Sequence, residues 1–572
     1  MEADMKRYLK TALVTSLVML ILIGATSLLL GKLYLDNKEV EKARTEEELD
    51  MNLYGSTQVD VNGVDVYELK LKGKEKNVKT FSFDSAKDIY NVEKSAQIRE
   101  KLELMKRKNT YSVDTPLWVY NPFGTNKLSL YVYFKTPEAY SVKYTIHTDD
   151  REIPDFTRKL YSSKGELLKE HEYQITGLVP GEKNYILLSL YNKKGEMEKQ
   201  LVYSITPATP KDAPKLRLTG IEGKSSEKLA TGLYVFMGED IYFYDNSGVL
   251  RAMLPMVDSK AANLIFVDGQ MVYNYSKNGF TVVDELGQVL ENYSMKNYKV
   301  AGDFVYDGYG NLFVLASSTK AQTTADRIVS VDMKTGKEKE VLDFAEVFPE
   351  MKKKASKGKA DKLNWLNLNS IAMVGGDSVV VSSKELSSII KVDGLNSAKP
   401  SVDYILSQDT VWKDSEYENL LYAKTTSEEG DKLFKSQFGQ GSLEVVKDAV
   451  TEQYYITMFN HNYGNSSTRK DLDWAEVEGV GTKKKDAAAS KYYKYYVDEE
   501  ASIYMLSDSF NVPYSTNGSL FSYGEHFVIN TPDAKCVNEY DKEGRLIRGL
   551  EYGGKNKPVR VQKQDMKAFW YR

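Results

Sequence analysis

The sequence predicts an all-β ectodomain, in which an immunoglobulin-like β-sandwich is followed by a six-bladed β-propeller and preceded by one transmembrane helix. Three observations lead to this fold class. An uncharged apolar run covers residues 11–31, short strands alternate hydrophobic and polar residues over about 111–207, and Asp–Gly turns recur through the rest of the chain. With 572 residues, 42% of them hydrophobic, the chain is long enough for two or three packed domains.

Changes of pattern along the chain mark the expected domain boundaries. Residues 1–35 are predicted to be a cytoplasmic tail and transmembrane signal anchor, and 36–110 a stalk, a short β segment and a helix. The immunoglobulin-like domain is expected over 111–210 and the propeller over 211–572.

The apolar run Thr11–Gly31 predicts the membrane anchor. As a helix it would span roughly 31 Å, which matches the hydrocarbon core of a bilayer. Three cations, Lys6, Arg7 and Lys10, precede it, so the N-terminus is expected in the cytoplasm and the domains beyond about residue 35 outside the cell membrane. A cleaved signal peptide is the alternative, although Ile23-Gly24-Ala25 is a poor cleavage site.

The segment between the anchor and the sandwich changes from stalk to helix. Residues 37–49 are highly charged with weak helical patterning, which is typical of a stalk. From Asp84 to Lys108, apolar side chains at Ile98, Leu102 and Met105 recur at helical spacing between charged residues. We therefore expect one helix whose apolar face packs on the next domain.

A period of two predicts the sandwich. Leu128, Leu130, Val132 and Phe134 alternate with polar or aromatic neighbours, and similar strands recur at 142–146, 172–175 and 185–191. Turn-forming Pro and Gly residues separate these strands. Short strands punctuated in this way are typical of an immunoglobulin-like fold.

Turns of the form Asp-x-x-Gly or Asp-x-x-x-Gly predict the propeller. They begin at Asp245, Asp284, Asp332 and Asp541, and degraded versions stand at Asp393 and Asp498. About six units, each with several strands, indicate radial repetition of small sheets. Two inserts, near 351–362 and 476–490, are expected to be surface loops.

Four separated segments carry a further pattern. Residues 364–370 read Asn-Trp-Leu-Asn-Leu-Asn-Ser, 382–391 contain Lys384, 298–303 read Tyr-Lys-Val-Ala-Gly-Asp, and 436–441 read Ser-Gln-Phe-Gly-Gln-Gly. Taken in their order along the chain, these segments resemble the bacterial aryl-sulfate sulfotransferases. That family usually has Asp-Trp-x-His-x-Asn-Ser in the first segment, Arg in the second, His-His-Asp in the third and Gly-Gln-His at the end of the fourth.

The resemblance implies an enzyme that moves a sulfuryl group between phenols without a nucleotide cofactor. In such chemistry an imidazole nitrogen attacks the sulfate ester, while other imidazoles and a guanidinium stabilise the developing charge. The family positions hold Ala301, Gly302, Asn367, Lys384 and Gly441 here, so no expected catalytic side chain is retained. Glycine and alanine offer neither a nucleophile nor a side-chain hydrogen bond, and Lys384 keeps a positive charge without a bidentate fork.

We therefore expect a membrane-anchored, catalytically degenerate binding or interaction module. Candidate ligand-binding residues are Asp303, Asn367, Asn369, Lys384 and Gln440, for a phenolic or sulfated small molecule. The alternative is an active aryl sulfotransferase that uses an altered route, and an envelope scaffold without a small ligand is a third interpretation. A homodimer is the assembly that the resemblance implies.

Histidine and cysteine are scarce, with four and one in the chain. His461 is the histidine nearest a segment expected to line the channel, and it is a candidate for a relocated nucleophile. His147, His171 and His526 fit structural positions in strands. Cys536 cannot form an intramolecular disulfide and is expected to be a small buried core residue.

Charge and motif content exclude other classes of protein. Lys and Arg number 77 against 81 Asp and Glu, and no basic stripe separates from the acidic background, which excludes nucleic acid as a partner. The sequence has no His-Glu-x-x-His and no paired-cysteine pattern, so we expect no metal site.

Overall fold

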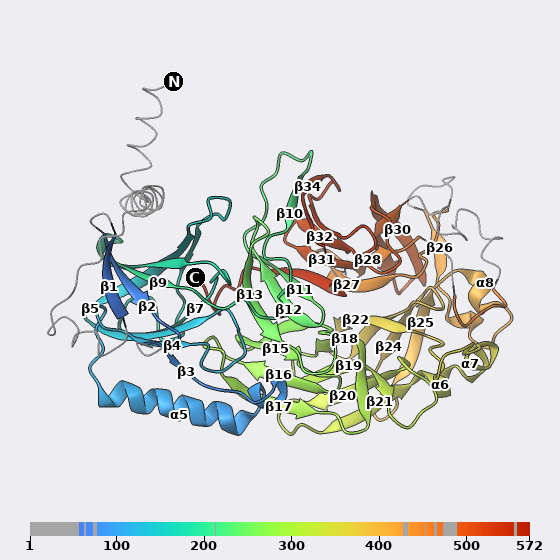
Figure 1. Cartoon of the computed structure of the whole chain (residues 1–572). Helices are drawn as coiled ribbons and strands as arrows, with labels where there is room; N and C mark the ends of the chain where they lie inside the picture. The colour runs from blue at the N-terminus through green and yellow to red at the C-terminus, as the bar shows by residue number, and fades with distance from the viewer. Residues whose placement is uncertain are drawn as a thin grey trace.

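The computed structural model describes residues 56–61, 64–72, 77–211, 213–426, 433–451, 453–462, 466–472, 489–553 and 557–572. The expected anchor at 11–31 and the stalk at 37–49 lie outside these ranges. Within them, no helix is both long enough and apolar enough to cross a membrane. A β-sandwich and a β-propeller lie side by side, and helix α5 (Val92–Lys108) runs along their lower edge in Figure 1.

The sandwich contains nine strands, most of them antiparallel. In pairing order they are β1 (Ser56–Val61), β2 (Val64–Leu69), β9 (Met197–Ile205), β8 (Asn184–Tyr191), β5 (Leu130–Thr148), β4 (Leu117–Tyr120) and β3 (Lys79–Thr80), with β6 (Phe156–Lys159) and β7 (Leu168–Ile175) also paired to β5.

Strand β5 takes part in both layers of the sandwich. Its first half, 130–135, pairs with β7, whereas 141–148 pairs with β8. The register with β7 shifts between Lys135 and Tyr140, as expected where a strand passes from one layer to the other. The separate strands predicted near 128–134 and 142–146 are therefore one long strand, because a bulge lets the chain change partners without a loop.

The helix expected over 84–108 is divided in two. Helix α4 (Ala86–Ile89) ends at Tyr90, and the side chain of Asn91 caps α5 by accepting a hydrogen bond from the Lys94 N–H at 2.8 Å. An amide cap of this kind satisfies a free N–H at a helix start, and it begins a new helix with a new direction.

Helix α5 joins the two domains. It buries Ile98 and Leu102 against the sandwich, and the Ser95 hydroxyl accepts a hydrogen bond from Val289 N in the propeller at 2.9 Å. Arg99 pairs with Glu172 of β7 at 2.8 Å. The helix therefore packs on both domains through its apolar face and its charged flank.

The propeller has six blades, which we name A to F. Blade A contains β35 (Arg560–Gln564), β11 (Leu233–Met237), β12 (Asp240–Tyr244) and β13 (Leu250–Pro255). Blade B contains β14 (Leu264–Val267), β15 (Gln270–Asn274), β16 (Gly279–Val283) and β17 (Val289–Ser294). Blade C contains β18 (Tyr298–Tyr306), β19 (Asn311–Ser318), β20 (Arg327–Asp332) and β21 (Glu338–Asp343).

Blades D to F complete the ring. Blade D contains β22 (Leu368–Gly375), β23 (Ser378–Ser383), β24 (Ser388–Asp393) and β25 (Ser401–Leu406). Blade E contains β27 (Gly441–Lys447), β28 (Tyr454–Asn460), β29 (Ser490–Asp498), β30 (Ile503–Val512) and β26 (Ala423–Thr425). Blade F contains β31 (Ser519–Tyr523), β32 (His526–Thr531), β33 (Cys536–Tyr540), β34 (Leu546–Glu551) and β10 (Thr219–Glu222).

Short helices connect some of these strands. They are α6 (Phe344–Val347), α7 (Pro349–Lys354), α8 (Asp409–Trp412) and a 3-10 turn at Glu418–Leu420. The Lys-rich insert predicted near 351–362 includes the end of α7.

The two ends of the propeller sequence close the ring. Strand β35 pairs with β11 as the inner strand of blade A, and β10 pairs with β34 at the outer edge of blade F. The first strands of neighbouring blades, such as β18 and β22 or β22 and β27, lie next to each other and line the centre. Closure from both ends leaves no open edge between the first and last blades.

Each predicted Asp turn joins the third and fourth strands of a blade, counted from the centre. At Asp245 the carboxylate accepts hydrogen bonds from Ser247 N at 2.8 Å and Val249 N at 3.0 Å, and Gly248 takes φ of 79°. A left-handed φ of this kind favours glycine. Local turn chemistry therefore marks the blades in the sequence.

Candidate functional site

A cavity of about 560 Å³ lies where the first strands of the six blades begin, at one mouth of the central channel. Every blade contributes residues at or just before its first strand: Val559 and Arg560 from A, Lys260 and Ala261 from B, Val300 and Gly302 from C, Asn367 and Asn369 from D, Gly441 and Ser442 from E, Asn517 and Gly518 from F. Residues following second strands, including Lys384, His461 and Asp533, complete the wall.

Five of the residues singled out from the sequence meet in this cavity. Gly302, Asn367, Asn369, Lys384 and Gly441 all line it, although they come from three blades and four separate segments. The segments that carry the family resemblance therefore converge on one site.

The other three positions lie behind the cavity wall. Ala301, Asp303 and Gln440 are not among the lining residues. Gln440 is fully buried, and its amide donates to Ser382 Oγ and to the Ser388 carbonyl at 3.1 and 2.9 Å. Its side chain ties β27 to blade D and does not reach a ligand in the cavity.

Breaks in strand pairing set the side chains of blade D toward the channel. On β22, Leu368 pairs with Ser383 and Ser370 pairs with the adjacent Ser382, so Asn369 is the extra residue of a bulge. The residue before the strand, Asn367, has a left-handed φ of 51°. Bulges re-aim side chains and are common beside functional sites, and asparagine tolerates left-handed backbone better than most residues.

Blades C and E carry similar breaks at the same level. The pairing of β18 skips from Val300 to Phe304, and that of β27 skips from Gly441 to Glu444. Gly302, Asn369 and Gly441 therefore stand at or beside breaks in strand pairing, and all three line the channel mouth.

Asn369 occupies the space beside two of the substituted positions. A Cβ atom at Gly441 would stand 2.9 Å from Asn369 Nδ2, and one at Gly302 would stand 3.2 Å from Asn369 Cα. Gly302 also has φ of 154°, which side chains rarely adopt. Asn369 Nδ2 is held by the Gln440 carbonyl at 2.9 Å. The absence of side chains at 302 and 441 and the position of Asn369 are thus mutually dependent.

Lys384 presents its ammonium group to the cavity in a largely buried setting. Nζ donates to the Asn517 side-chain oxygen at 2.7 Å and to the Thr516 carbonyl at 2.9 Å. Burial lowers the pKa of Lys384 to about 8, against the opposing attraction of Glu385 and Asp533. The group is therefore mostly charged at neutral pH and loses its proton readily in weak base.

Arg560 is held at the cavity wall by a buried carboxylate. Its guanidinium makes a two-point contact with Asp303, with Nη1–Oδ1 and Nη2–Oδ2 distances of 2.7 Å. Asp303 is 2% exposed and also accepts hydrogen bonds from Asn263 Nδ2 at 3.0 Å and Ser370 Oγ at 3.3 Å. Asp303 therefore fixes a cation of the cavity and is itself screened from it.

Cations outnumber carboxylates on the cavity wall. The described lining includes Lys260, Lys384, Lys557 and Arg560, against one carboxylate, Asp533. Sequence reasoning missed three of these cations, because they come from loops and strand starts in blades A and B. None of the four segments singled out from the sequence contains Lys260, Lys557 or Arg560.

His461 also lines the cavity. Burial and the neighbouring Lys384 ammonium hold its pKa well below the usual value, so its imidazole is neutral near pH 7. The ring packs edge-on against Phe459, with centroids 5.5 Å apart. Among the described residues no carboxylate forms a hydrogen bond with either ring nitrogen, so none of them orients this imidazole as a base requires.

The remaining histidines and the cysteine have local partners. His147 contacts Asp155 at 2.7 Å, and His526 contacts Glu539 at 2.7 Å. His171 is buried against Phe134, and burial lowers its pKa to about 4. Cys536 is buried, as expected, and burial raises the pKa of its thiol.

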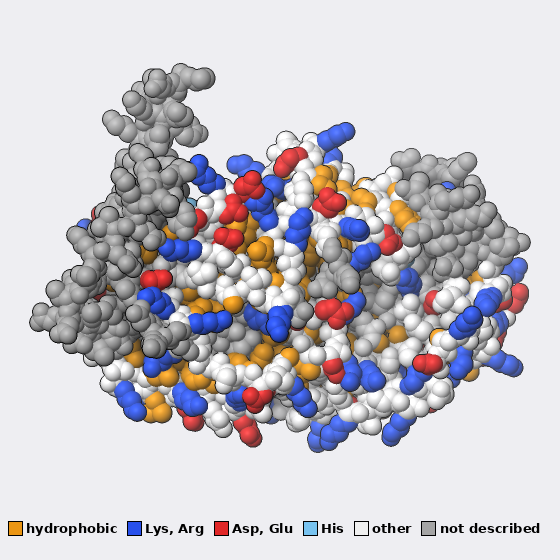
Figure 2. Space-filling view, in the orientation of Figure 1, with side chains coloured by type: hydrophobic (Ala, Val, Ile, Leu, Met, Phe, Trp, Pro, Cys, Tyr) orange, Lys and Arg blue, Asp and Glu red, His pale blue; other side chains and the backbone are white. Residues whose placement is uncertain are grey.

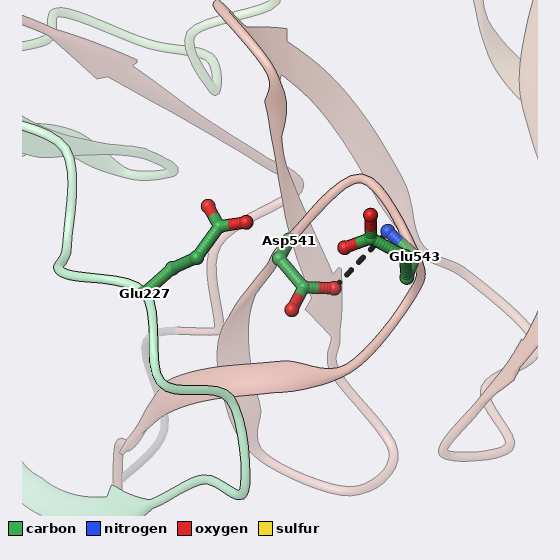
Figure 3. Close-up of side chains that lie close together, drawn as sticks. All are labelled: Glu227, Asp541 and Glu543. Atoms are coloured by element: carbon green, nitrogen blue, oxygen red, sulfur yellow. Dashed lines mark hydrogen bonds between the residues drawn. The ribbon is translucent and has the colours of Figure 1, made fainter.

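A second group of charged side chains lies on blade F. Glu227, Asp541 and Glu543 approach one another, and Asp541 accepts a hydrogen bond from Glu543 N at 3.1 Å (Figure 3). Arg545 contacts both Asp541 and Glu543, at 2.8 and 2.9 Å. Glu227 contacts His526 at 3.1 Å. These contacts form an ion-pair network that ties the segment before β11 to the β33–β34 turn.

Charges of both signs are mixed over the outer surface. On the face seen in Figure 2, Lys and Arg side chains stand among Asp and Glu side chains over both domains.

Comparison with solved structures finds distant likenesses. An auxiliary nutrient binding protein from Bacteroides ovatus has 12% identity and a TM-score of 0.31, covering 77% of this chain and 90% of its own. The periplasmic gluconolactonase PpgL of Pseudomonas aeruginosa has 9% identity and a TM-score of 0.29, covering 74% and 99%. Virginiamycin B lyase from Staphylococcus aureus has 9% identity and a TM-score of 0.28, covering 66% and 95%. Likenesses this low carry no argument about function, and no curated protein matches the chain.

Family models give a specific result. The arylsulfotransferase Ig-like domain matches residues 117–208, within the sandwich. The arylsulfotransferase (ASST) family matches residues 220–572, which is more than half of the chain and covers all six blades. The chain therefore belongs to the arylsulfotransferase (ASST) family.

Proposed function

We propose that this protein is a catalytically silent member of its family, which binds a small oxyanion-bearing ligand, such as an aryl sulfate, at the mouth of the propeller channel. The observation that carries the proposal is the composition of the cavity wall. It brings Lys260, Lys384, Lys557 and Arg560 together, while glycine and asparagine stand where the resemblance places catalytic histidines.

Physical chemistry favours anion binding at such a wall. A cation that is partly shielded from water attracts an anion more strongly than one on the open surface. Among the described residues, Lys384 Nζ donates to two neutral oxygen atoms, and an ammonium has a third N–H that can donate to a ligand. Arg560 is already neutralised by Asp303, so Lys384 contributes the larger share of the attraction.

Transfer chemistry requires side chains that the positions matched to the family's catalytic residues do not supply here. A nucleophile must attack the sulfur atom, and donors must stabilise the charge on the leaving phenolate. Neither Gly302 nor Gly441 has a side chain that could supply a nucleophilic nitrogen. The Asn367 amide does not gain or lose a proton near neutral pH. Binding without turnover is therefore the function that the residues favour.

A second candidate function rests on His461. Its neutral imidazole lines the same cavity as Lys384, so sulfuryl transfer by a relocated nucleophile is the competing proposal. The two proposals differ in one outcome, because only the second predicts cleavage of an aryl sulfate that depends on a phenol.

The N-terminal run supports a further part of the proposal, namely that residues 11–31 anchor the protein and the two domains lie outside the cell membrane. Protease added to intact cells is expected to remove both domains. Protection of both domains, or recovery of the whole mature chain from the medium, would contradict this topology.

Calorimetry of the full-length protein with inorganic sulfate and with 4-nitrophenyl sulfate tests the binding proposal. We expect both ligands to bind, to compete with each other, and to bind more weakly as salt increases. If neither ligand produces saturable heat at low ionic strength, the binding proposal is wrong.

A further inference from the structure

A second cavity, of about 410 Å³, lies between blades A and F, where the ring closes. Its wall includes Phe236 and Tyr242 and Tyr244 from blade A, and Tyr552, which follows the last strand of blade F. The volume falls in the range of small-molecule pockets, which are lined mainly by hydrophobic and aromatic side chains. This cavity is distinct from the charged cavity at the channel mouth.

Aromatic rings form the inner surface of the cavity. Phe236 packs against two other rings of the wall, with its ring centroid 4.9 Å from that of Tyr244 and 5.8 Å from that of Tyr552. The two neighbours meet Phe236 at 55° and 80°, so edges and faces are both presented. Edge-to-face contacts with a further planar ring are favourable at such a surface.

The hydroxyls of Tyr244 and Tyr552 are committed to the protein. Tyr244 donates to the Lys215 carbonyl at 2.9 Å, and Tyr552 donates to Asn530 Oδ1 at 2.9 Å. A sugar would need several polar partners inside the cavity. A planar apolar ring needs few, and so it suits this wall better.

Polar groups stand at the rim. Lys215 and Glu239 line the cavity and are both exposed. They offer a hydrogen-bond donor and an acceptor to a ligand whose ring lies deeper. This arrangement fits one hydroxyl group on an aromatic ring.

The two cavities are neighbours that share one lining residue. Pro558 lines both, and Glu239 at the rim of the aromatic cavity pairs with Lys260 of the charged cavity at 3.5 Å. One cavity is lined by cations and favours anions, whereas the other is lined by aromatic rings and favours apolar rings.

We propose that the cavity between blades A and F binds an uncharged phenolic ring, independently of any anion in the charged cavity. The ring packs against Phe236, Tyr242 and Tyr552, and its hydroxyl reaches the rim at Lys215 or Glu239. The site does not depend on the binding function proposed above.

Binding of 4-fluorophenol to the full-length protein, followed by ¹⁹F NMR, tests this site. Gly553 lines the cavity, a Cβ atom there meets nothing within 4 Å, and its backbone is outside the left-handed region. Gly553→Trp should therefore be tolerated at its Cβ, and an indole on the cavity wall should weaken binding at least tenfold. Gly375→Trp is the matched control, because a Cβ at Gly375 also meets nothing within 4 Å and this residue lines neither cavity.

Tyr242→Leu gives a second test that keeps an apolar wall but removes a ring, and we expect it to weaken binding severalfold. Lys384→Met, which removes a cation from the charged cavity, should weaken sulfate binding and leave 4-fluorophenol binding unchanged. The site is contradicted if 4-fluorophenol does not bind, if Gly553→Trp and Tyr242→Leu bind it like the parent, or if Lys384→Met abolishes its binding. Equal competition by methyl glucoside would overturn the aromatic assignment.

Discussion

The two halves of the channel mouth differ in the chemistry that they present. Blades C, D and E contribute Gly302, Asn367, Asn369 and Gly441, which carry no charge, whereas blades A and B contribute Arg560, Lys557 and Lys260. Among the described residues of blades C, D and E that line the cavity, the ionisable ones are Lys384 and His461. Under the proposed function, the cations of both halves, Lys384 included, would hold the anion, whereas transfer would need side chains that Gly302 and Gly441 do not have, so binding could persist without transfer.

The largest expected effect concerns the contact between the halves, in which Asp303 of blade C holds Arg560 of blade A. Asp303→Ala should lower the free energy of unfolding by about 3–5 kcal/mol, because a guanidinium whose side chain is only 12% exposed loses its carboxylate partner. Urea unfolding measures this change. Glu239→Ala, which breaks an exposed pair with Lys260, is the control and should cost less than about 1 kcal/mol. Equal losses in the two variants would mean that the Asp303 pair is unimportant.

The next largest effect is expected when Lys384, the cation that blade D contributes to the wall, is replaced. Lys384→Met should weaken sulfate binding by about 1.5–3 kcal/mol, or roughly ten- to 150-fold, since a charged hydrogen bond is lost. Calorimetry on the full-length protein provides the measurement. Lys542→Met, at an exposed turn of blade F, is the control and should bind like the parent. Unchanged affinity in Lys384→Met would remove this residue from the site.

Placing a histidine at Gly441 tests whether the cavity wall beside Asn369 can accommodate an imidazole side chain. Gly441→His should destabilise the fold by about 1–3 kcal/mol, because the new side chain meets the Asn369 amide. The double variant Gly441→His with Asn369→Ala should recover part of that loss. Thermal unfolding of the three proteins measures it, and a single variant as stable as the parent would show that Asn369 does not block the position.

The smallest expected effect is the dependence of binding on pH. The pKa of Lys384 is about 8 in the fold, below its ordinary value, so its charge is present below pH 8 and is lost as the pH rises through that value. Sulfate affinity should fall by up to about tenfold between pH 7 and 9. His461, Asp533, Glu385 and Lys557 also lie in or beside this wall, and Lys384→Met separates their influence. The same fall in Lys384→Met would assign the pH dependence to another group.

The contribution of Lys384 to folding stability should change with pH in the opposite direction to its contribution to sulfate binding. A lysine whose folded pKa is lowered binds fewer protons in the fold than in the unfolded chain between about pH 8 and its ordinary pKa. The contribution of Lys384 to stability therefore rises with pH through this window, while anion binding weakens.

Much of the fold could be predicted because it depends on local chemistry. The Asp turns that mark the blades rely on a side chain and a glycine within a few residues, and all six join corresponding strands. The strand β5 could not be predicted as one element, because its continuity depends on partners in both layers. The break between α4 and α5 depends on the Asn91 cap, which the apolar spacing did not reveal.

The site could be predicted only where the family resemblance reached. It identified Gly302, Asn367 and Gly441, which do converge on the cavity. It gave no means to see that Asp303 and Gln440 lie behind the wall, since burial depends on bulges and neighbouring blades. Lys260 and Lys557 stand in segments without a motif, and only the closing of the ring brings them to the channel mouth.

The central claim is that the protein binds aryl sulfates and does not transfer their sulfuryl group. The most direct test is release of 4-nitrophenol from 4-nitrophenyl sulfate by the unmodified full-length protein, at ligand concentrations that saturate binding, with and without a phenol acceptor. We predict saturable binding with no release above the rate in buffer and no sulfated histidine in the protein. Release that requires the acceptor, and that disappears in His461→Ala, would contradict the claim and identify His461 as a relocated nucleophile.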